Sequence, residues 1–374
     1  MGVLDGVRVV ELAGFGPAPF CAMLLADMGA DVVRIERANA PERGIPIEHR
    51  FEVMNRGRRS VELDLKTSAG RDMLLQLAAR AEILIEGYRP GVMERLGVGP
   101  QDCMGLNAAL VYGRVTGYGQ DGPLAQSAGH DINFIAVSGV LDTIGPANGP
   151  PVPPLNLVAD YGGGGMLLAI GVLAACLEAR RSGQGQVVDA AMLDGSALLM
   201  AGTFGLQAAG LWQESRGSNV LDGGAPWYGV YETSDGRHLA LGAVEPRFYA
   251  QLTECLGLDQ EKLAPRSDRT RWGELRSVFA SRIAQRTRSE WDAIFEGTDA
   301  CVSAVLSSRE AAVHPHVVSR GSLVTVQGVL QPAPAPRFSR TPSELRRPPP
   351  ESGAHTEEVL LEWGLRDMGD CATQ

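Results

Sequence analysis

The first 120 residues alternate between short apolar runs and helical patterns, which constrains the fold more than any other feature of the chain. The stretches 20–28 and 68–79 have the 3.6-residue apolar spacing of helices. Strands that alternate with such helices form a parallel sheet with helices on both faces. We therefore predict an α/β fold. The apolar runs that we expect to be its buried strands are 7–12, 31–36, 82–86 and 110–115.

Ligands bind parallel sheets at the carboxyl ends of the strands. Arg37 and Arg89 follow two of the predicted strands, and the planar guanidinium of arginine suits phosphate groups. Acidic neighbours such as Glu62 and Asp64 nearly balance the local basic charge, so phosphate binding and a solvated surface are equal alternatives. The basic residues of this region are Arg34, Arg37, Arg56, Arg58, Arg59, Lys66, Arg89 and Arg95.

The turn at 14–19 lies between a predicted strand and a predicted helix, and its Gly14-Phe15-Gly16 imitates a dinucleotide fingerprint. Pro17 and Pro19 remove two of the N–H donors that a pyrophosphate would need. The turn therefore favours a plain βα connection over dinucleotide binding.

From Pro226 onward the pattern changes. A hairpin is predicted at 227–233 and 238–244, and helices at 245–255 and 271–285. These elements indicate a second, smaller domain at 221–307. A proline-rich, extended stretch at 331–350 precedes a last short helix at 356–363.

Composition excludes several classes of protein. The net charge of -10 argues against nucleic acid as a partner. Six widely spaced cysteines without a CxxC pair argue against a zinc ribbon or a disulfide scaffold and favour a cytoplasmic location. The uncharged apolar run 166–177 is too short to span a bilayer, so no membrane is expected. His314 and His316 have no acidic cluster beside them, and no metal site is expected.

Three polar residues are candidates for chemistry. His130 is expected in the first turn of a helix, where it can stay neutral and act as a base, although a capping or packing role is the favoured alternative. Asp160 precedes four glycines, which suits either close approach of a substrate or a plain helix cap. Glu245 ends a strand, and alone it indicates only a helix start.

Long stretches of the chain resemble the class III CoA-transferase superfamily, also called the CaiB/BaiF type. The resemblance implies an interlocked homodimer whose chains each have a Rossmann-like large domain with a parallel sheet and a smaller α+β domain. It implies a large CoA-binding domain at 1–190 and 334–374, a linker helix at 191–220, the small domain at 221–307 and a return linker at 308–333. The matching stretches are 4–12, 25–37, 63–66, 86–92, 116–123 and 221–226.

The resemblance also implies a function. Transferases of this superfamily use an aspartate nucleophile, which Asp160 matches. Racemases pair that aspartate with a histidine, which His130 matches, and Glu245 matches a glutamate that orients the histidine, from the partner chain. CoA is expected to contact Arg37, Leu63, Asp64, Leu65, Lys66, Gly87, Tyr88, Arg89, Arg95, Gly129, Asp131, Ile132, Asn133 and Phe134.

The histidine favours a racemase that inverts the α-carbon of 2-methylacyl-CoA thioesters by 1,1-proton transfer through an enolate. His130 and Asp160 would then be the two acid/base groups, one on each face of the carbon. No cofactor is expected, because coenzyme A is part of the substrate. The alternatives are a class III CoA-transferase that forms an aspartyl-CoA thioester at Asp160, and a non-catalytic CoA-binding dimer.

Overall fold

The computed structural model of the protein describes residues 2–37 and 47–365, in two compact units. The first unit comprises the described residues up to Ser138, Leu155–Met200 and those from Arg320 onward; the second comprises Gly139–Pro154 and Ala201–Ser319. Residues 139–154, which we assigned to the large domain, thus cluster with the second unit. Residues 366–374 of the predicted C-terminal segment lie outside the described residues.

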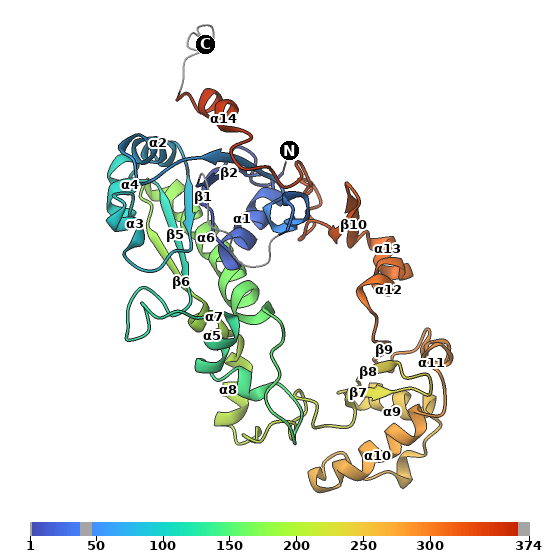
Figure 1. The fold of residues 1–374 in the computed structure, drawn as a ribbon. Coiled ribbons are helices and arrows are strands. Elements are labelled where there is room, and N and C mark those ends of the chain that lie inside the picture. Colours follow the sequence, from blue (N-terminus) through green and yellow to red (C-terminus); the bar gives the residue numbers. More distant parts are fainter. Residues whose placement is uncertain (1, 38–46, 366–374) are drawn as a thin grey trace. The chain divides into compact units, whose positions relative to one another are not determined.

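The first unit is built on a six-stranded parallel sheet with the strand order β3-β2-β1-β4-β5-β6 (Figure 1). Successive strands are added toward one edge of the sheet from β1 to β3 and toward the other edge from β4 to β6. Ligands of such sheets bind at the carboxyl ends of the strands, beside the point between β1 and β4 where this order reverses. The predicted α/β class with a parallel sheet is confirmed. The strands are β1 (Arg8–Leu12), β2 (Asp31–Glu36), β3 (Arg58–Glu62), β4 (Ile83–Glu86), β5 (Val111–Thr116) and β6 (Val187–Ala191).

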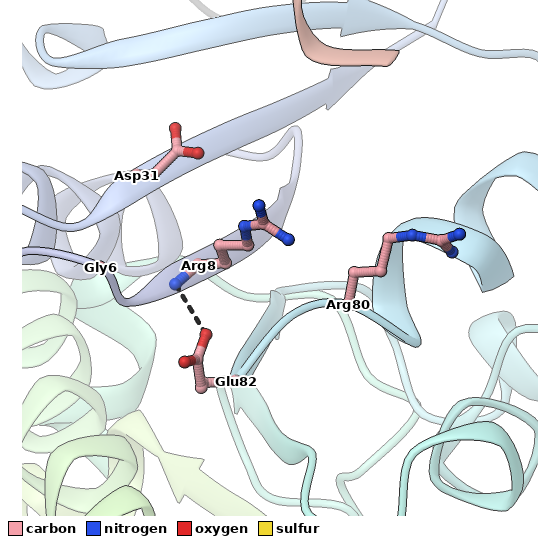
Figure 2. Close-up of a pocket in the computed structure, with 5 residues that line it drawn as sticks. All are labelled: Gly6, Arg8, Asp31, Arg80 and Glu82. Carbon is pink, nitrogen blue, oxygen red and sulfur yellow. Dashed lines mark hydrogen bonds between the residues drawn. The ribbon is translucent and has the colours of Figure 1, made fainter. Parts of the chain in front are cut away.

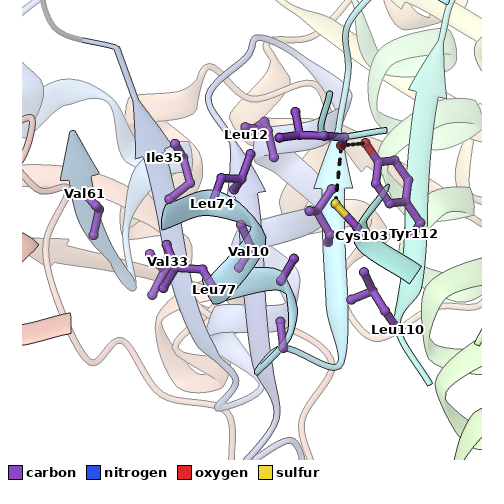
Figure 3. Packing of buried hydrophobic residues seen from close by; sticks show 14 of the residues in the cluster. Val10, Leu12, Val33, Ile35, Val61, Leu74, Leu77, Cys103, Leu110 and Tyr112 are labelled. Atoms are coloured by element: carbon purple, nitrogen blue, oxygen red, sulfur yellow. Dashed lines mark hydrogen bonds between the residues drawn. The ribbon is translucent and has the colours of Figure 1, made fainter. Parts of the chain in front are cut away.

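Helices cover both faces of this sheet (Figure 1). On one face, Leu74 and Leu77 pack against the strands (Figure 3). Val359 and Trp363 from the C-terminal end of the chain join the same core. Full burial of each such leucine contributes about 2 kcal/mol. The helices are α1 (Pro17–Asp27), α2 (Ser68–Ala78), α3 (Val92–Arg95), α4 (Pro100–Leu106), α5 (Asp131–Val137), α6 (Leu167–Ser182), α7 (Met192–Leu199) and α14 (Thr356–Glu362).

Strand β3 escaped prediction because it begins with two arginines. Arg58 is fully buried and its Nε donates to Glu11 at 2.8 Å, while Arg34 donates to the same carboxylate at 2.7 Å. Arg56 is also buried and pairs with Asp27. A solvated or phosphate-binding role is therefore wrong for these three arginines, since buried charges need such partners.

The helix that contains Asp160 begins earlier than predicted. Residues Leu157–Met166 form a π-helix, η4, which continues into α6, so Asp160 lies within the first turn and does not precede the helix. A Cβ on Gly163 would lie 2.7 Å from the backbone N of Ser196 on α7, and one on Gly164 would lie 2.9 Å from the Pro17 side chain. Close packing of η4 against α1 and α7 therefore explains these glycines.

The stretch Leu157–Ser182 is also long and apolar enough to cross a membrane by length and composition, and no other helix in the described residues is. It is longer than the run that we considered in the sequence. Leu168, Val172 and Ala175 on α6 are buried, as in the core helix of a globular protein.

The second unit contains a three-stranded antiparallel sheet in the order β7-β8-β9, and the predicted hairpin is confirmed as β7 and β8. Its core is aromatic, with Trp227, Trp272, Phe279 and Trp291 buried. The linker helix expected at 191–220 is divided into α7 and α8. The elements are α8 (Ala201–Ala208), β7 (Tyr228–Glu232), β8 (His238–Gly242), α9 (Pro246–Cys255), α10 (Trp272–Ile283), α11 (Arg288–Phe295), β9 (Val302–Ala304), α12 (Ser308–Val313) and α13 (Pro315–Arg320).

The predicted return linker has more regular structure than expected. It contains α12, α13 and a small hairpin of β10 (Leu323–Val326) and β11 (Val329–Pro332) that belongs to the first unit. The 3₁₀ turns of the described residues are η1 (His49–Phe51), η2 (Val53–Asn55), η3 (Leu141–Thr143), η5 (Gln260–Lys262) and η6 (Arg269–Arg271).

Candidate active site

The carboxylate of Asp131 joins the two segments that carry the candidate bases. Its Oδ2 accepts hydrogen bonds from the backbone N–H groups of Ala159, at 2.7 Å, and Asp160, at 2.9 Å. Asp131 is the first residue of α5, and Ala159 and Asp160 lie in the first turn of η4, where N–H groups have no partner within the helix. One buried side chain thus holds the residue after His130 against the backbone of Asp160.

His130 is the N-cap of α5, one residue before the predicted position. Its backbone N–H donates to the side-chain Oδ1 of Asn133 at 3.0 Å, which anchors the start of the helix. The imidazole is exposed. The His130 side chain is therefore accessible to a substrate and does not pack in the core.

Asp160 is half-buried, and its environment changes its acidity. Burial raises the pKa of the carboxyl, and the neighbouring Asp131 carboxylate raises it further. The Asn156 amide opposes this by donating to Oδ2 at 2.9 Å, and a positive charge on His130 also lowers the pKa of Asp160. The net pKa lies above the ordinary value of 3.8, so this aspartate is a stronger base than a solvated one.

Gly16 lies directly against the Asp160 carboxylate. A Cβ at this position would be 3.0 Å from Oδ2, and the backbone φ of +65° is itself unfavourable for other residues. The turn 14–19 therefore borders the candidate site, although it does not have the form of a dinucleotide loop. Pro17 occupies the first position of α1, which suits proline and explains its presence in the turn.

The other residues of the predicted CoA-binding segment 129–134 have mixed exposure. The Phe134 ring is buried; a Cβ on Gly129 would lie 2.7 Å from it and one on Gly117 only 2.1 Å. Ile132 and Asn133 are exposed. The glycine of Gly129-His130-Asp131 thus makes room for a ring that supports the turn, while the exposed side chains remain available for a ligand.

Six of the predicted CoA-binding residues line one cavity of about 150 Å³. It lies at the carboxyl ends of β2 and β3 and after β4, where ligands of such sheets bind. Arg37 and Lys66 are exposed at its edge, and Leu63 and Leu65 are half-buried. The six residues are Arg37, Leu63, Asp64, Leu65, Lys66 and Tyr88.

The remaining predicted contacts lie outside that cavity. Gly87, Arg89 and Arg95 are exposed just beyond β4, and the Arg95 guanidinium would be 3.1 Å from a Cβ on Gly91. Glu245 belongs to the second unit, where it is the exposed N-cap of α9 and its side chain makes no capping bond. The Glu245 carboxylate therefore does not cap α9.

A second cavity, of about 390 Å³, lies at the opposite edge of the sheet (Figure 2). Arg8 and Asp31, at the amino ends of β1 and β2, line it together with Arg80 and Glu82. The backbone N–H of Arg8 donates to Glu82, and its guanidinium lies 5.0 Å from the centre of the Trp363 ring. These contacts and the position of the cavity make it a poor candidate for the active site.

Sequence reasoning missed Asn156 and Gly16, which both contact the Asp160 carboxylate. Asn156 is the N-cap of η4 and lies four residues before Asp160, and its side-chain amide donates to the Asp160 carboxylate across this first turn. Gly16 is distant in sequence, and no local pattern indicates its contact. His130 and Asp160 could be identified because each lies in a recognisable local motif.

Known proteins resemble this chain along nearly its whole length. Residues 4–356 match the model of CoA-transferase family III. The alpha-methylacyl-CoA racemase of Mus musculus is 47% identical over 97% of this chain and 94% of its own length, and the human racemase is 44% identical over the same shares. A CAIB/BAIF family protein from Brucella suis has a similar structure, with a TM-score of 0.82, 25% identity, and coverage of 97% of this chain and 99% of its own. The chain belongs to CoA-transferase family III.

Proposed function

We propose that this protein is a racemase that inverts the α-carbon of 2-methylacyl-CoA thioesters. The observation that carries the proposal is the pair of hydrogen bonds from Ala159 and Asp160 to Asp131, which tie Asp160 to the residue beside His130. Two groups able to exchange protons are thereby held on adjacent segments. The similarity to racemases of mouse and human supports the same conclusion.

The reaction needs one base on each face of the α-carbon. In one direction, the Asp160 carboxylate takes the α-proton, the C–H bond electrons form the enolate of the thioester, and the His130 imidazolium gives a proton to the opposite face. The reverse direction exchanges the roles. Each turnover moves one proton onto the protein and one off it, so no electrons are gained or lost and the reaction needs no redox cofactor.

Two features suit this chemistry. Burial raises the pKa of Asp160, which brings it closer to the operating pH, where a general base is most effective. The enolate oxygen needs N–H donors, and the first turn of α5 supplies N–H groups that have no partner within the helix. The CoA part would extend toward the cavity lined by Arg37 and Lys66.

We further propose that two copies associate and that Glu245 of the partner subunit orients His130. Several large apolar side chains on α6 and α7 are exposed, among them Leu177 at 75% and Leu198 at 61%. Large apolar side chains left exposed on two helices are typical of association surfaces. A dimer would cover them and would bring a second α9 start to the site.

Incubation of one enantiomer of a 2-methylacyl-CoA in heavy water tests the function. We expect deuterium at the α-carbon and formation of the other enantiomer with no acceptor acid present. A CoA-transferase would instead leave the α-proton in place and move CoA from Asp160 to an added carboxylic acid. That second result would replace the proposal by the transferase alternative.

A further inference from the structure

A buried arginine, Arg114, joins two neighbouring strands of the sheet to the helix α3. It lies on β5 directly beside Glu86 of β4, and both side chains are buried. The Nε of Arg114 donates to Oε1 of Glu86 at 2.7 Å. Its two terminal nitrogens donate to the two carboxylate oxygens of Glu94 on α3, at 2.7 and 3.3 Å. One guanidinium thus holds two carboxylates from different elements in fixed directions.

The same ionic bridge fixes the loop between β4 and α3. The other oxygen of Glu86, Oε2, accepts a hydrogen bond of 2.7 Å from the backbone N–H of Tyr88. Within the single turn of α3, Met93 is the buried residue. Apolar packing of Met93 has no preferred direction, whereas the paired hydrogen bonds to Glu94 do. The bridge therefore determines how α3 is rotated against the sheet.

The loop and α3 form one wall of the cavity of about 150 Å³ that would hold the CoA part of the substrate. Tyr88 lines this cavity from the loop, and Val92 and Leu96 line it from the start and the end of α3. Arg114 itself does not line the cavity. It supports the wall from behind, through the carboxylates that it binds.

We propose that Arg114 is a positioning residue for CoA binding, which with Glu86 and Glu94 holds the loop after β4 and the helix α3 in the arrangement that receives CoA. The inference rests on the proposed function, because it takes CoA to occupy this cavity. A wall that is already ordered loses less conformational entropy when the ligand arrives, which increases affinity. The hydrogen bonds of the bridge end on β4, the loop after it and α3, so they concern the binding of CoA and not the proton transfer.

Two substitutions that change the charge in opposite directions distinguish positioning from simple electrostatics. Arg114→Met removes a positive charge, Glu94→Ala removes a negative one, and each breaks the bridge. Because CoA is an anion, electrostatics alone predicts weaker binding in the first variant and tighter binding in the second. Positioning predicts weaker binding in both. The dissociation constant of free CoA is measured by calorimetry with the full chain.

A similar bridge at the amino end of β2 supplies the matched controls. Arg59 is also buried, and it donates to Asp31 and to Glu362 on α14. Arg59→Met and Glu362→Ala make the same two charge changes, and neither residue lines the cavity. Glu94→Gln isolates the hydrogen bond, because it loses the same charge as Glu94→Ala but keeps an oxygen that accepts from Arg114.

Arg114→Met should weaken CoA binding by about ten-fold and Glu94→Ala by about three-fold, because CoA must then order the wall as it binds. Glu94→Gln should bind CoA more tightly than Glu94→Ala. With a 2-methylacyl-CoA as substrate, Arg114→Met should raise KM and leave kcat close to that of the wild type. Thermal unfolding shows which variants are folded; the Glu94 side chain is 45% exposed, so its variants keep the test decisive if Arg114→Met does not fold.

The two control variants should bind CoA as the wild type does, even where they are less stable. Unchanged CoA binding in both Arg114→Met and Glu94→Ala would overturn the inference, and so would tighter binding in Glu94→Ala. Equal weakening in Arg59→Met and Glu362→Ala would also overturn it, because the effect would then be a general loss of stability.

Lys66→Ala, within the cavity, separates this inference from the proposed function. If Lys66→Ala weakens CoA binding and the Arg114 and Glu94 variants do not, the positioning role alone is wrong. If the Arg114 and Glu94 variants behave as predicted but the wild type exchanges no α-proton for deuterium, the positioning role stands and the racemase is rejected.

Discussion

The carboxylate of Asp131 accepts a hydrogen bond of 2.9 Å from the backbone N–H of Asp160. Asp131 is buried, and its Oδ1 has no hydrogen-bond partner among the described residues, so its side chain serves chiefly to hold η4 against α5. We predict that Asp131→Ala lowers kcat for racemisation and also lowers stability, because two N–H groups lose their acceptor.

The conservative variant distinguishes positioning from simple destabilisation. Asp131→Asn keeps an accepting oxygen but removes the charge that raises the pKa of Asp160. It should retain most of kcat and move the acid limb of the pH profile to lower pH. If Asp131→Asn is as inactive as Asp131→Ala, catalysis requires the negative charge of Asp131, and a positioning role alone is contradicted.

The pH dependence of kcat/KM should show the altered acidity of Asp160. Burial raises the pKa of its carboxyl above 3.8, and Asp160 must be ionised to accept the α-proton, so activity should fall on acidification at a pH above that value. Asn156→Ala removes the hydrogen bond that stabilises the carboxylate and should move this limb to still higher pH. A limb that stays in place, or moves to lower pH, would contradict the assignment.

A methyl group at position 16 should disturb the Asp160 carboxylate. Gly16→Ala places a Cβ 3.0 Å from Oδ2, and we expect kcat to fall at least ten-fold, because this carboxylate must be well placed. Gly6→Ala is the matched control, since Gly6 also has a positive φ, +83°, but nothing lies within 4 Å of its Cβ position. Both variants should lose about 1 kcal/mol of stability from backbone strain, and only Gly16→Ala should lose activity.

Mixed dimers test whether Glu245 acts across an interface. If the partner subunit supplies it, a heterodimer of Asp160→Ala and Glu245→Ala chains contains one site with both substitutions and one intact site. Coexpression of the two inactive chains should then restore about a quarter of wild-type activity, since half of the random dimers carry one intact site of two. No recovery in mixtures that are shown to contain heterodimers would mean that Glu245 acts within its own chain or not at all.

Much of the fold follows from local patterns, and the parts that do not are those set by distant contacts. Strand β2 and the β7–β8 hairpin were predictable because their apolar side chains recur at the spacing of strands. Strand β3 was missed because its buried arginines look like surface residues until Glu11, 47 positions away, is placed beside Arg58.

The candidate site shows the same division. His130 and Asp160 were identified from their motifs and the family resemblance, whereas their connection through Asp131 was not. The early π-helical start of η4 also could not be predicted, since it depends on glycines that pack against α1 and α7. Local sequence therefore indicates which residues are chemically capable, and tertiary packing determines which of them meet.

The most direct test of the central claim follows α-proton exchange from each enantiomer separately in His130→Gln and Asp160→Asn. His316→Gln, at another exposed histidine, is the control and should behave as the wild type. We predict that each variant loses racemisation by about 10²–10⁴-fold but still exchanges the proton of the one enantiomer that faces its remaining base. Normal racemisation in His130→Gln, or loss of both exchanges in each variant, would contradict the account of two bases on opposite faces.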